Sequence, residues 1–203
     1  MSKAVVFDVG RVLVQWQLRA LFERLIPDES ELDWFLSNVV TEEWHFQSDR
    51  GRPLAEMVRE RCEEFPEHAH LIRAYAARFP ETVPGPIEGS MELVKRLHER
   101  GVPIYGLTNF GHEFWQIFRA SQPIFDLFDD VIVSGTEKVA KPAPRIYEIV
   151  EERSGRGGRD LFFTDDNPDN IAAAQARDWN AHLFIDAPTL EAELINQGFL
   201  TAQ

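Results

Sequence analysis

The sequence predicts an α/β fold, with a parallel sheet that carries helices on both faces and an all-helical segment inserted after the first strand. Two observations lead to this prediction. Short apolar runs recur along the chain without the alternation of a half-exposed strand, which is typical of parallel strands covered on both faces. In the second half of the chain these runs alternate with segments of helical periodicity, and this order implies parallel strands joined by right-handed crossovers.

The first predicted strand is the apolar run of residues 4–7, and a predicted cap follows it. Between about residues 18 and 80 apolar residues recur at helical spacing only, so we expect helices there and no strand. The expected helices are 18–26, 31–36, 54–65 and 71–79. A stretch rich in proline, residues 80–86, ends this part. We therefore expect an α/β core at residues 1–15 and 85–203 and a helical cap at residues 16–84.

The core elements follow the cap in regular order. A helix over 87–100 ends at Gly101, a residue favoured just past a helix. Further helices are expected near 112–120, 143–153, 168–178 and 188–196, between strands at 102–107, 131–133, 161–163 and 181–185. The glycine-rich segment 154–159 precedes a strand instead of following one, so we interpret it as a surface loop and not as a phosphate-binding loop.

Composition restricts the class of partner. The 203 residues include 21 basic and 34 acidic side chains, a net charge of −13, which disfavours nucleic acid and anionic membrane surfaces and leaves a small substrate as the expectation. No apolar run approaches the ~20 residues of a membrane span. Cys62 is the single cysteine and lies on an apolar helix face, so we expect a buried thiol and no internal disulfide. The chain begins with a strand instead of a signal peptide, which favours the cytoplasm.

Polar side chains follow four of the predicted strands, at the ends where ligands bind in open α/β sheets. They form an acid, a hydroxyl next to an amide, a cation and an acid pair. The residues are Asp8, Thr108, Asn109, Lys141, Asp165 and Asp166. If the strands adjoin, three carboxylates converge and cannot all stay ionised without a compensating charge. Ligands that are all oxygen favour Mg²⁺, which is usually completed by water and substrate phosphate.

The same residues have the chemistry of phosphoryl transfer. Lys141 could hold a nucleophilic carboxylate ionised and stabilise phosphoryl oxygens, while Thr108 and Asn109 could donate hydrogen bonds to those oxygens. An anion site that contains a carboxylate nucleophile is the equipment for a reaction through an aspartyl-phosphate.

Four segments together resemble the ordered motifs of the haloacid dehalogenase superfamily. They cover the chain in order and spacing, and they are Phe7-Asp8-Val9-Gly10, Leu107-Thr108-Asn109, the segment from Lys141 to Tyr147 and the segment from Phe163 to Asn170. The resemblance implies a Rossmann-like core, a helical cap after the first motif and Mg²⁺-dependent phosphatase chemistry. By position, it makes Asp8 the nucleophile and a metal ligand. It also assigns the Gly10 carbonyl and Asp166 to the metal, with Asp165 supporting the metal or Lys141.

Gly10 departs from the usual pattern, because most phosphatases of the superfamily carry there a second aspartate that acts as general acid and base. General acid catalysis contributes roughly 10²–10⁴-fold, so its loss should matter most for poor leaving groups. The chain is similar to an Asp-x-Gly subgroup that includes glucose 1-phosphate phosphatases, which favours a sugar phosphate or similar small phosphorylated metabolite. The alternatives are a metal-independent 2-haloacid dehalogenase, disfavoured by the retained acids Asp165 and Asp166, and a catalytically silent protein that binds a phospho-ligand or a partner.

The expected cap contains an aromatic, imidazole and acid cluster in residues 41–51. Our hypothesis is that Trp44 and His45 face the core and bind the leaving group, with His45 as a possible donor of the proton that Gly10 cannot supply. Packing within the cap is the alternative for both residues.

Overall fold

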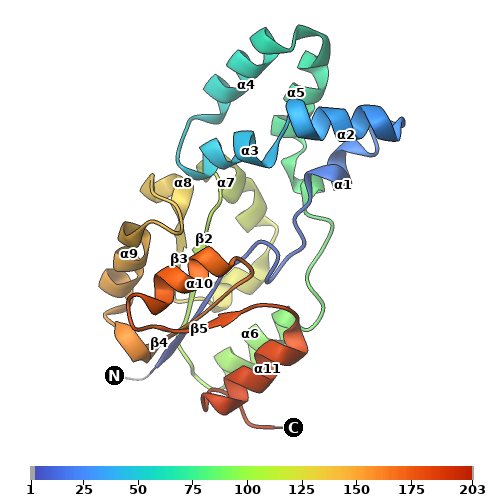
Figure 1. Cartoon of the computed structure of the whole chain (residues 1–203). Helices are drawn as coiled ribbons and strands as arrows, with labels where there is room; N and C mark the ends of the chain where they lie inside the picture. Colours follow the sequence, from blue (N-terminus) through green and yellow to red (C-terminus); the bar gives the residue numbers. More distant parts are fainter. Residues whose placement is uncertain (1–2, 203) are drawn as a thin grey trace.

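A computed structural model describes residues 3–202 and confirms a parallel α/β core of Rossmann-like form (Figure 1). Its sheet has five strands in the order β3-β2-β1-β4-β5, and every pairing is parallel. The strands are β1 (Ala4–Phe7), β2 (Ile104–Thr108), β3 (Asp130–Val133), β4 (Leu161–Asp165) and β5 (Asn180–Leu183). This order places the carboxyl ends of β1, β2 and β4 next to one another, because β1 lies at the centre of the sheet.

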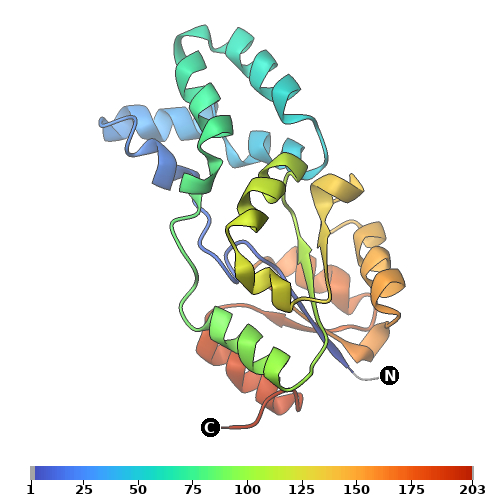
Figure 2. The ribbon, with the colours of Figure 1, turned by 180° about the vertical axis from the view of Figure 1, so that it is seen from behind.

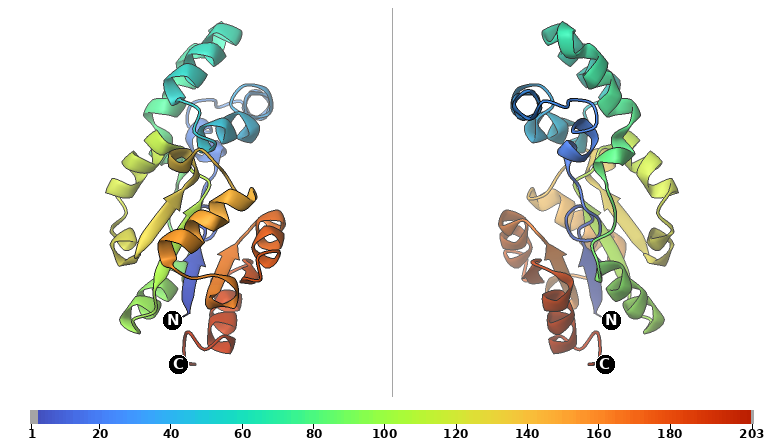
Figure 3. Two further views of the ribbon diagram at one scale, coloured as in Figure 1. Left: turned by 90° about the vertical axis from the view of Figure 1, so that its left-hand side faces the viewer. Right: turned by 90° about the vertical axis from the view of Figure 1, so that its right-hand side faces the viewer.

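Helices cover both faces of the sheet, as the continuous apolar strands predict. They are α6 (Ser90–Glu99), α7 (His112–Ala120), α8 (Ser134–Glu137), α9 (Pro144–Ser154), α10 (Pro168–Gln175) and α11 (Ala187–Asn196). Val5 and Phe7 of β1 belong to the apolar cluster shared with α6, α7 and α11, whereas Ala4 and Val6 belong to the cluster shared with α9 and α10. Figure 2 shows α6 and α11 side by side, and the side views of Figure 3 show the sheet between its two helix layers.

A helical segment stands over the carboxyl ends of the strands (Figure 1). From Leu18 to Thr82, all of which the structure describes, the chain forms helices and no strand. The helices are α1 (Leu18–Phe22), α2 (Glu29–Asn38), α3 (Glu42–Asp49), α4 (Leu54–Glu64) and α5 (Ala69–Ala77). Short 3₁₀ turns occur at η1 (Pro66–His68), η2 (Phe79–Thr82), η3 (Pro123–Leu127) and η4 (Gly158–Asp160). We call residues 18–82 the cap.

Two segments of the chain connect the cap to the core, and they lie alongside each other. The Gln15 backbone N–H donates to the Gly85 carbonyl at 2.8 Å, and the Gln17 N–H donates to the Thr82 carbonyl at 2.8 Å. An antiparallel bridge between Val14 and Pro86 continues the pairing. These bonds hold the base of the cap close to the loop that follows β1.

Helix α3 is the main cap element that periodicity does not predict. Its buried residues are Trp44, His45, Ser48 and Asp49, and only the first is apolar, so no apolar period marks the helix in the sequence. Its N-terminus is well capped, because the Thr41 hydroxyl accepts a hydrogen bond from the Trp44 N–H at 3.0 Å. The last strand is also shorter than the predicted 181–185, and Ile185 lies outside it with 74% of its surface exposed.

The structure bears on two expectations from the sequence, the lack of a membrane span and the burial of Cys62. Within residues 3–202, no helix combines the length and the apolar character needed to cross a bilayer. Cys62 is half-buried instead of fully buried, since it packs at the margin of the apolar cluster, where its thiol lies 3.8 Å from the Ala69 carbonyl oxygen.

Candidate active site

Three carboxylates meet where β1 and β4 end. Because Phe7 is paired with Thr164 in the sheet, the residues that follow these two strands lie side by side. Asp8, Asp165 and Asp166 each offer an oxygen, and these oxygens all lie within 4.8 Å of one another. Burial raises the pKa of Asp8 to about 7, and the nearby Lys141 opposes this shift. Such a crowded set of acids, two of them buried, needs positive charge to stay ionised.

Lys141 supplies one positive charge from within the cluster. Its Nζ lies 2.8 Å from Asp8 Oδ1 and 2.6 Å from Asp165 Oδ2, and its side chain is almost completely buried. Burial alone would lower the pKa of Lys141, but Asp165 and Asp8 outweigh it and leave the pKa above its ordinary value. Lys141 is therefore a permanent cation between two carboxylates.

The two acids at the end of β4 have different surroundings. Asp165 Oδ1 accepts from the Asn167 N–H at 2.8 Å and from Asn170 Nδ2 at 3.0 Å, while Oδ2 accepts from Lys141 and from Asn170 at 3.1 Å. Both oxygens of this fully buried residue thus accept from protein donors. Asp166, in contrast, is half-buried and lines an open cavity. The geometry therefore favours Asp166 over Asp165 as a ligand for a metal, a distinction that the sequence leaves open.

Thr108 and Asn109, at the end of β2, are placed differently from each other. Asn109 lines the cavity, but its amide is used by the loop that holds the lysine: Nδ2 donates to the Lys141 carbonyl at 3.1 Å, and Oδ1 accepts from the Lys141 N–H at 2.8 Å. Thr108, the last residue of β2, is buried and is not among the residues that line the cavity. In this structure Asn109 therefore orients the lysine loop, which sequence reasoning does not anticipate.

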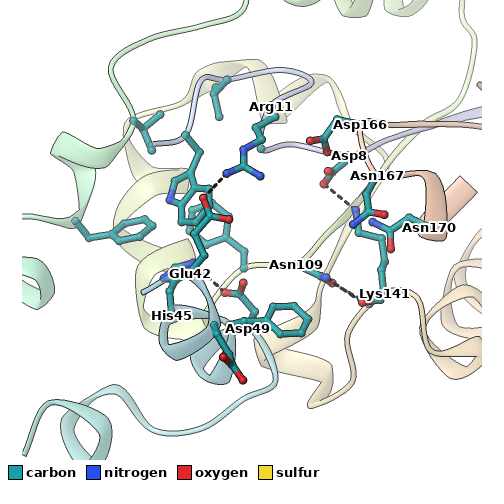
Figure 4. Close-up of a pocket in the computed structure, with 18 residues that line it drawn as sticks. Asp8, Arg11, Glu42, His45, Asp49, Asn109, Lys141, Asp166, Asn167 and Asn170 are labelled. Atoms are coloured by element: carbon teal, nitrogen blue, oxygen red, sulfur yellow. Dashed lines mark hydrogen bonds and ion pairs between the residues drawn. The ribbon is translucent and has the colours of Figure 1, made fainter. Parts of the chain in front are cut away.

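The cavity lies between the carboxylate cluster and the cap (Figure 4). Its volume is about 420 Å³, and it extends from Asp8 and Gly10 to helix α3 and the turn η2. Much of its wall is apolar, formed by Val14, Trp16, Phe46, Phe79, Val83 and Phe110. On one side Arg11 spans from core to cap, because it donates to Glu42 at 2.6 Å and lies 5.0 Å from the centre of the Trp16 ring. The site is therefore shared by both parts of the chain.

Residues 2–178, most of the chain, match the family described as haloacid dehalogenase-like hydrolases. The chain belongs to this family. The hydrolase is 27% identical over 178 residues to the sesquiterpene phosphatase astK of Aspergillus oryzae, an alignment that covers 86% of this chain and 85% of the relative. It is 23% identical over 106 residues to the drimenol cyclase drtB of Aspergillus calidoustus, covering 52% of this chain and 20% of that protein.

Solved structures share the fold. An enzyme of the family from Bacteroides thetaiotaomicron, crystallised with magnesium and inorganic phosphate, is 20% identical with a TM-score of 0.69, covering 92% of this hydrolase and 96% of that chain. The L-2-haloacid dehalogenase of Xanthobacter autotrophicus is 21% identical with a TM-score of 0.64, covering 98% of this hydrolase and 85% of that chain. At this level of identity the likeness establishes the fold of the hydrolase.

The two cap residues selected from the sequence lie in different places. Trp44 is buried within the cap, with its ring 5.2 Å from that of Tyr75 and beneath the Arg61 guanidinium, and it is not among the residues that line the cavity. His45 does line the cavity of the hydrolase, and its Nδ1 shares a short hydrogen bond with the Tyr75 hydroxyl. Burial lowers the pKa of His45 to about 4, so its imidazole is neutral at pH 7 and poorly suited to donate a proton.

A residue missed by the sequence analysis, Asp49, lines the cavity from the end of α3. Its side chain is 6% exposed and its Oδ1 lies 3.5 Å from His45 Nε2. Burial raises the pKa of Asp49 to about 7, against an opposing hydrogen bond from Ser48. One signal could have identified it: Asp49 follows His45 by four residues, and this spacing places two side chains on one face of a helix.

Proposed function

We propose that the hydrolase is a Mg²⁺-dependent phosphatase that cleaves a small phosphomonoester through an aspartyl-phosphate on Asp8. The observation that carries this proposal is the buried Asp8 carboxylate at the carboxyl edge of the sheet, 2.8 Å from Lys141 and within 4.8 Å of two further acids. The likeness to a sesquiterpene phosphatase and to a family enzyme crystallised with magnesium and phosphate supports it.

The donor set fits Mg²⁺. The three converging acids offer only carboxylate oxygens as ligand atoms, and a hard cation that prefers oxygen ligands relieves their repulsion. Asp8, Asp166 and the carbonyl of Gly10, which lines the same cavity, would hold the ion. When bound, it supplies charge that stabilises phosphoryl oxygens.

The protein's own groups prepare the nucleophile. The Val9 N–H donates to Asp8 Oδ1 at 2.7 Å and Lys141 approaches the same oxygen, so the carboxylate is held in one orientation. Asp165 fixes the Lys141 ammonium from its other side, and Asn109 fixes the lysine backbone through two hydrogen bonds. Orientation of this kind removes much of the entropic barrier to attack on phosphorus.

The organic part of the substrate would lie against the apolar wall of the cavity. Trp16, Phe46, Phe79 and Phe110 provide aromatic surface at a site about the size of a small metabolite. We therefore propose an apolar alcohol, such as an isoprenoid, as the leaving group, in line with the substrate class in the name of the sesquiterpene phosphatase. The sugar phosphate expected from the sequence stays a prediction to be compared with it.

The test is hydrolysis of p-nitrophenyl phosphate with and without Mg²⁺, using an Asp8→Asn variant as control. We expect Mg²⁺-dependent turnover in the wild type even without a general acid at Gly10, because p-nitrophenolate barely needs a proton from the enzyme. The variant should show no turnover, because it lacks the nucleophilic carboxylate. Farnesyl phosphate and glucose 1-phosphate then compare the two substrate classes. Absence of turnover by the wild type would contradict the proposal, and halide release from 2-haloacids would distinguish a dehalogenase from a silent binding protein.

A further inference from the structure

The hydrolase carries no acid at the position where a proton donor would normally follow the nucleophile. Gly10 has no side chain, and a Cβ placed there would meet no atom within 4 Å apart from those of its chain neighbours, so the space beside Gly10 is open. An alcohol leaves as a high-energy alkoxide unless a proton reaches its oxygen. If the enzyme cleaves alkyl phosphates, another residue must supply this proton.

The carboxylates that line the cavity differ in what they are free to do. Asp8 and Asp166 belong to the cluster at the sheet edge. Glu42 is exposed and paired with Arg11 at 2.6 Å, and Glu43 is exposed to solvent. Among the acids of the described chain that line this cavity, Asp49 alone is both buried and outside that cluster.

We propose that Asp49 of the cap is the general acid and base of the phosphatase reaction. The inference rests on the proposed function, and it assigns to α3 a catalytic role that the first motif lacks. Figure 4 shows Asp49 across the cavity from Asp8, beside His45 and facing Asn109. A phosphomonoester bound at Asp8 would therefore extend its leaving oxygen towards this carboxyl group.

A polar chain that runs through the cap orients Asp49. The Tyr75 hydroxyl is hydrogen-bonded to His45 Nδ1, and His45 Nε2 faces Asp49 Oδ1 at 3.5 Å. The Ser48 hydroxyl lies 3.4 Å from the same oxygen. His45 is itself fixed between aromatic rings, since it stacks on Phe79 with ring centres 5.8 Å apart. Both side-chain neighbours approach Oδ1, which holds the carboxyl plane in one orientation.

Asp49 is also fixed to the core and not only to the cap. A Cβ added to Gly111, in the loop after β2, would lie 2.8 Å from Ser48 Oγ, so α3 packs directly on this loop. The Gly111 backbone also hydrogen-bonds to Asp49. These contacts attach the carboxyl group to the core loop as well as to α3, and general acid catalysis requires a positioned acid.

The charged groups around Asp49 agree with both roles. It faces neutral His45 from α3, the Tyr75 hydroxyl from α5 and, at longer range, the Lys141 ammonium from the core. Burial dominates and raises the pKa of Asp49 to about 7, so near neutral pH it can both donate and accept a proton.

The proton balance covers two half-reactions. In the first, the Asp8 carboxylate attacks phosphorus, the bond from phosphorus to the leaving oxygen breaks, and the Asp49 proton moves to that oxygen to give the alcohol. In the second, Asp49 removes a proton from the attacking water, a new phosphorus–oxygen bond forms, and the bond from phosphorus to Asp8 breaks. Phosphate leaves, and Asp49 is protonated again.

The experiment compares two substrates of similar size on the Mg²⁺-loaded enzyme. Benzyl phosphate has a poor leaving group, whereas p-nitrophenyl phosphate has a good one. For Asp49→Asn we expect kcat/KM on benzyl phosphate to fall by roughly 10²–10⁴-fold, with a far smaller loss on p-nitrophenyl phosphate. Because the variant also lacks the base for water, it should release a burst of p-nitrophenolate before slow turnover. Asp160→Asn, an exposed aspartate on η4, is the matched control.

Equal losses on both substrates, or no loss on either, would overturn the role of Asp49 while leaving the phosphatase itself established. Inability of the wild type to hydrolyse benzyl phosphate would overturn it too, since no acid would then serve the leaving group. A second measurement avoids the variant: wild-type kcat/KM on benzyl phosphate should fall above about pH 7 relative to that on p-nitrophenyl phosphate. Parallel profiles would contradict the inference. Failure of the wild type on both substrates would instead refute the proposed function.

Discussion

Replacing Asp49 by asparagine should stabilise the folded hydrolase at alkaline pH. The physical reason is the burial that raises the pKa of Asp49 from 3.8 to about 7. Between these two values the folded chain binds more protons than the unfolded chain, so the free energy of unfolding falls as the pH rises. The loss is complete above about pH 7 and absent below about pH 4. Asparagine has nearly the same shape and carries no charge, so it avoids this loss.

The magnitude follows from the two pKa values. The difference between 3.8 and about 7, at roughly 1.36 kcal/mol for each pKa unit, corresponds to about 4 kcal/mol in favour of the variant at high pH. Urea denaturation of both proteins between about pH 4 and 8.5, without Mg²⁺, measures this difference directly. Asp160→Asn removes an exposed carboxylate of the same charge and serves as the control.

The result that refutes this reasoning is a stability difference that stays constant across the pH range or favours the wild type as the pH rises. Either outcome would mean that Asp49 is not buried as a neutral acid. The predicted direction also has a functional meaning. A residue whose removal stabilises the fold but slows the reaction is one that is retained for activity.

Three further predictions concern the core. Lys141→Met should lower the free energy of unfolding by about 3–5 kcal/mol in urea denaturation, because it leaves two buried carboxylates without their cation. Gly135→Ala should destabilise by about 1–3 kcal/mol in thermal unfolding, since its Cβ would lie 2.5 Å from a backbone nitrogen, whereas Gly85→Ala, where nothing lies within 4 Å of the added Cβ, should cost less. Mg²⁺ should raise the melting temperature of the wild type but not that of Asp166→Asn. A rise in the variant as large as that in the wild type would argue against Asp166 as a ligand.

Because the site is divided between core and cap, we expect its two parts to respond to different perturbations. The sheet edge holds Asp8, the proposed nucleophile, next to Lys141, whose ammonium makes ion pairs of 2.8 Å with Asp8 and 2.6 Å with Asp165. Helix α3 adds a buried acid that depends on a close contact with the core loop at Gly111. Substitutions at the sheet edge should therefore slow the hydrolysis of all substrates alike, whereas the effect of substitutions in α3 should depend on the leaving group.

Local sequence was sufficient for the core because its elements have regular periods. The apolar run before Asp8 is buried on both faces, as its lack of alternation predicts, and the four strands β1 to β4 occur where such runs end in polar residues. The convergence of Asp8 with the acids after β4 follows from parallel pairing, since register alone makes them neighbours. Helix α3 has no comparable apolar period, because three of its four buried residues are polar, so periodicity does not predict it.

The sequence by itself therefore determined the parallel α/β architecture, the presence of a helical segment after β1 and the set of residues at the sheet edge. Tertiary structure alone decided which of them face the cavity. It directs both Asp165 oxygens to protein donors, gives the Asn109 amide to the lysine loop, and places Trp44 inside the cap. It also brings Asp49 to the cavity. The physical reason is that strand register and periodicity are local, whereas the direction of a side chain depends on how two distant segments pack.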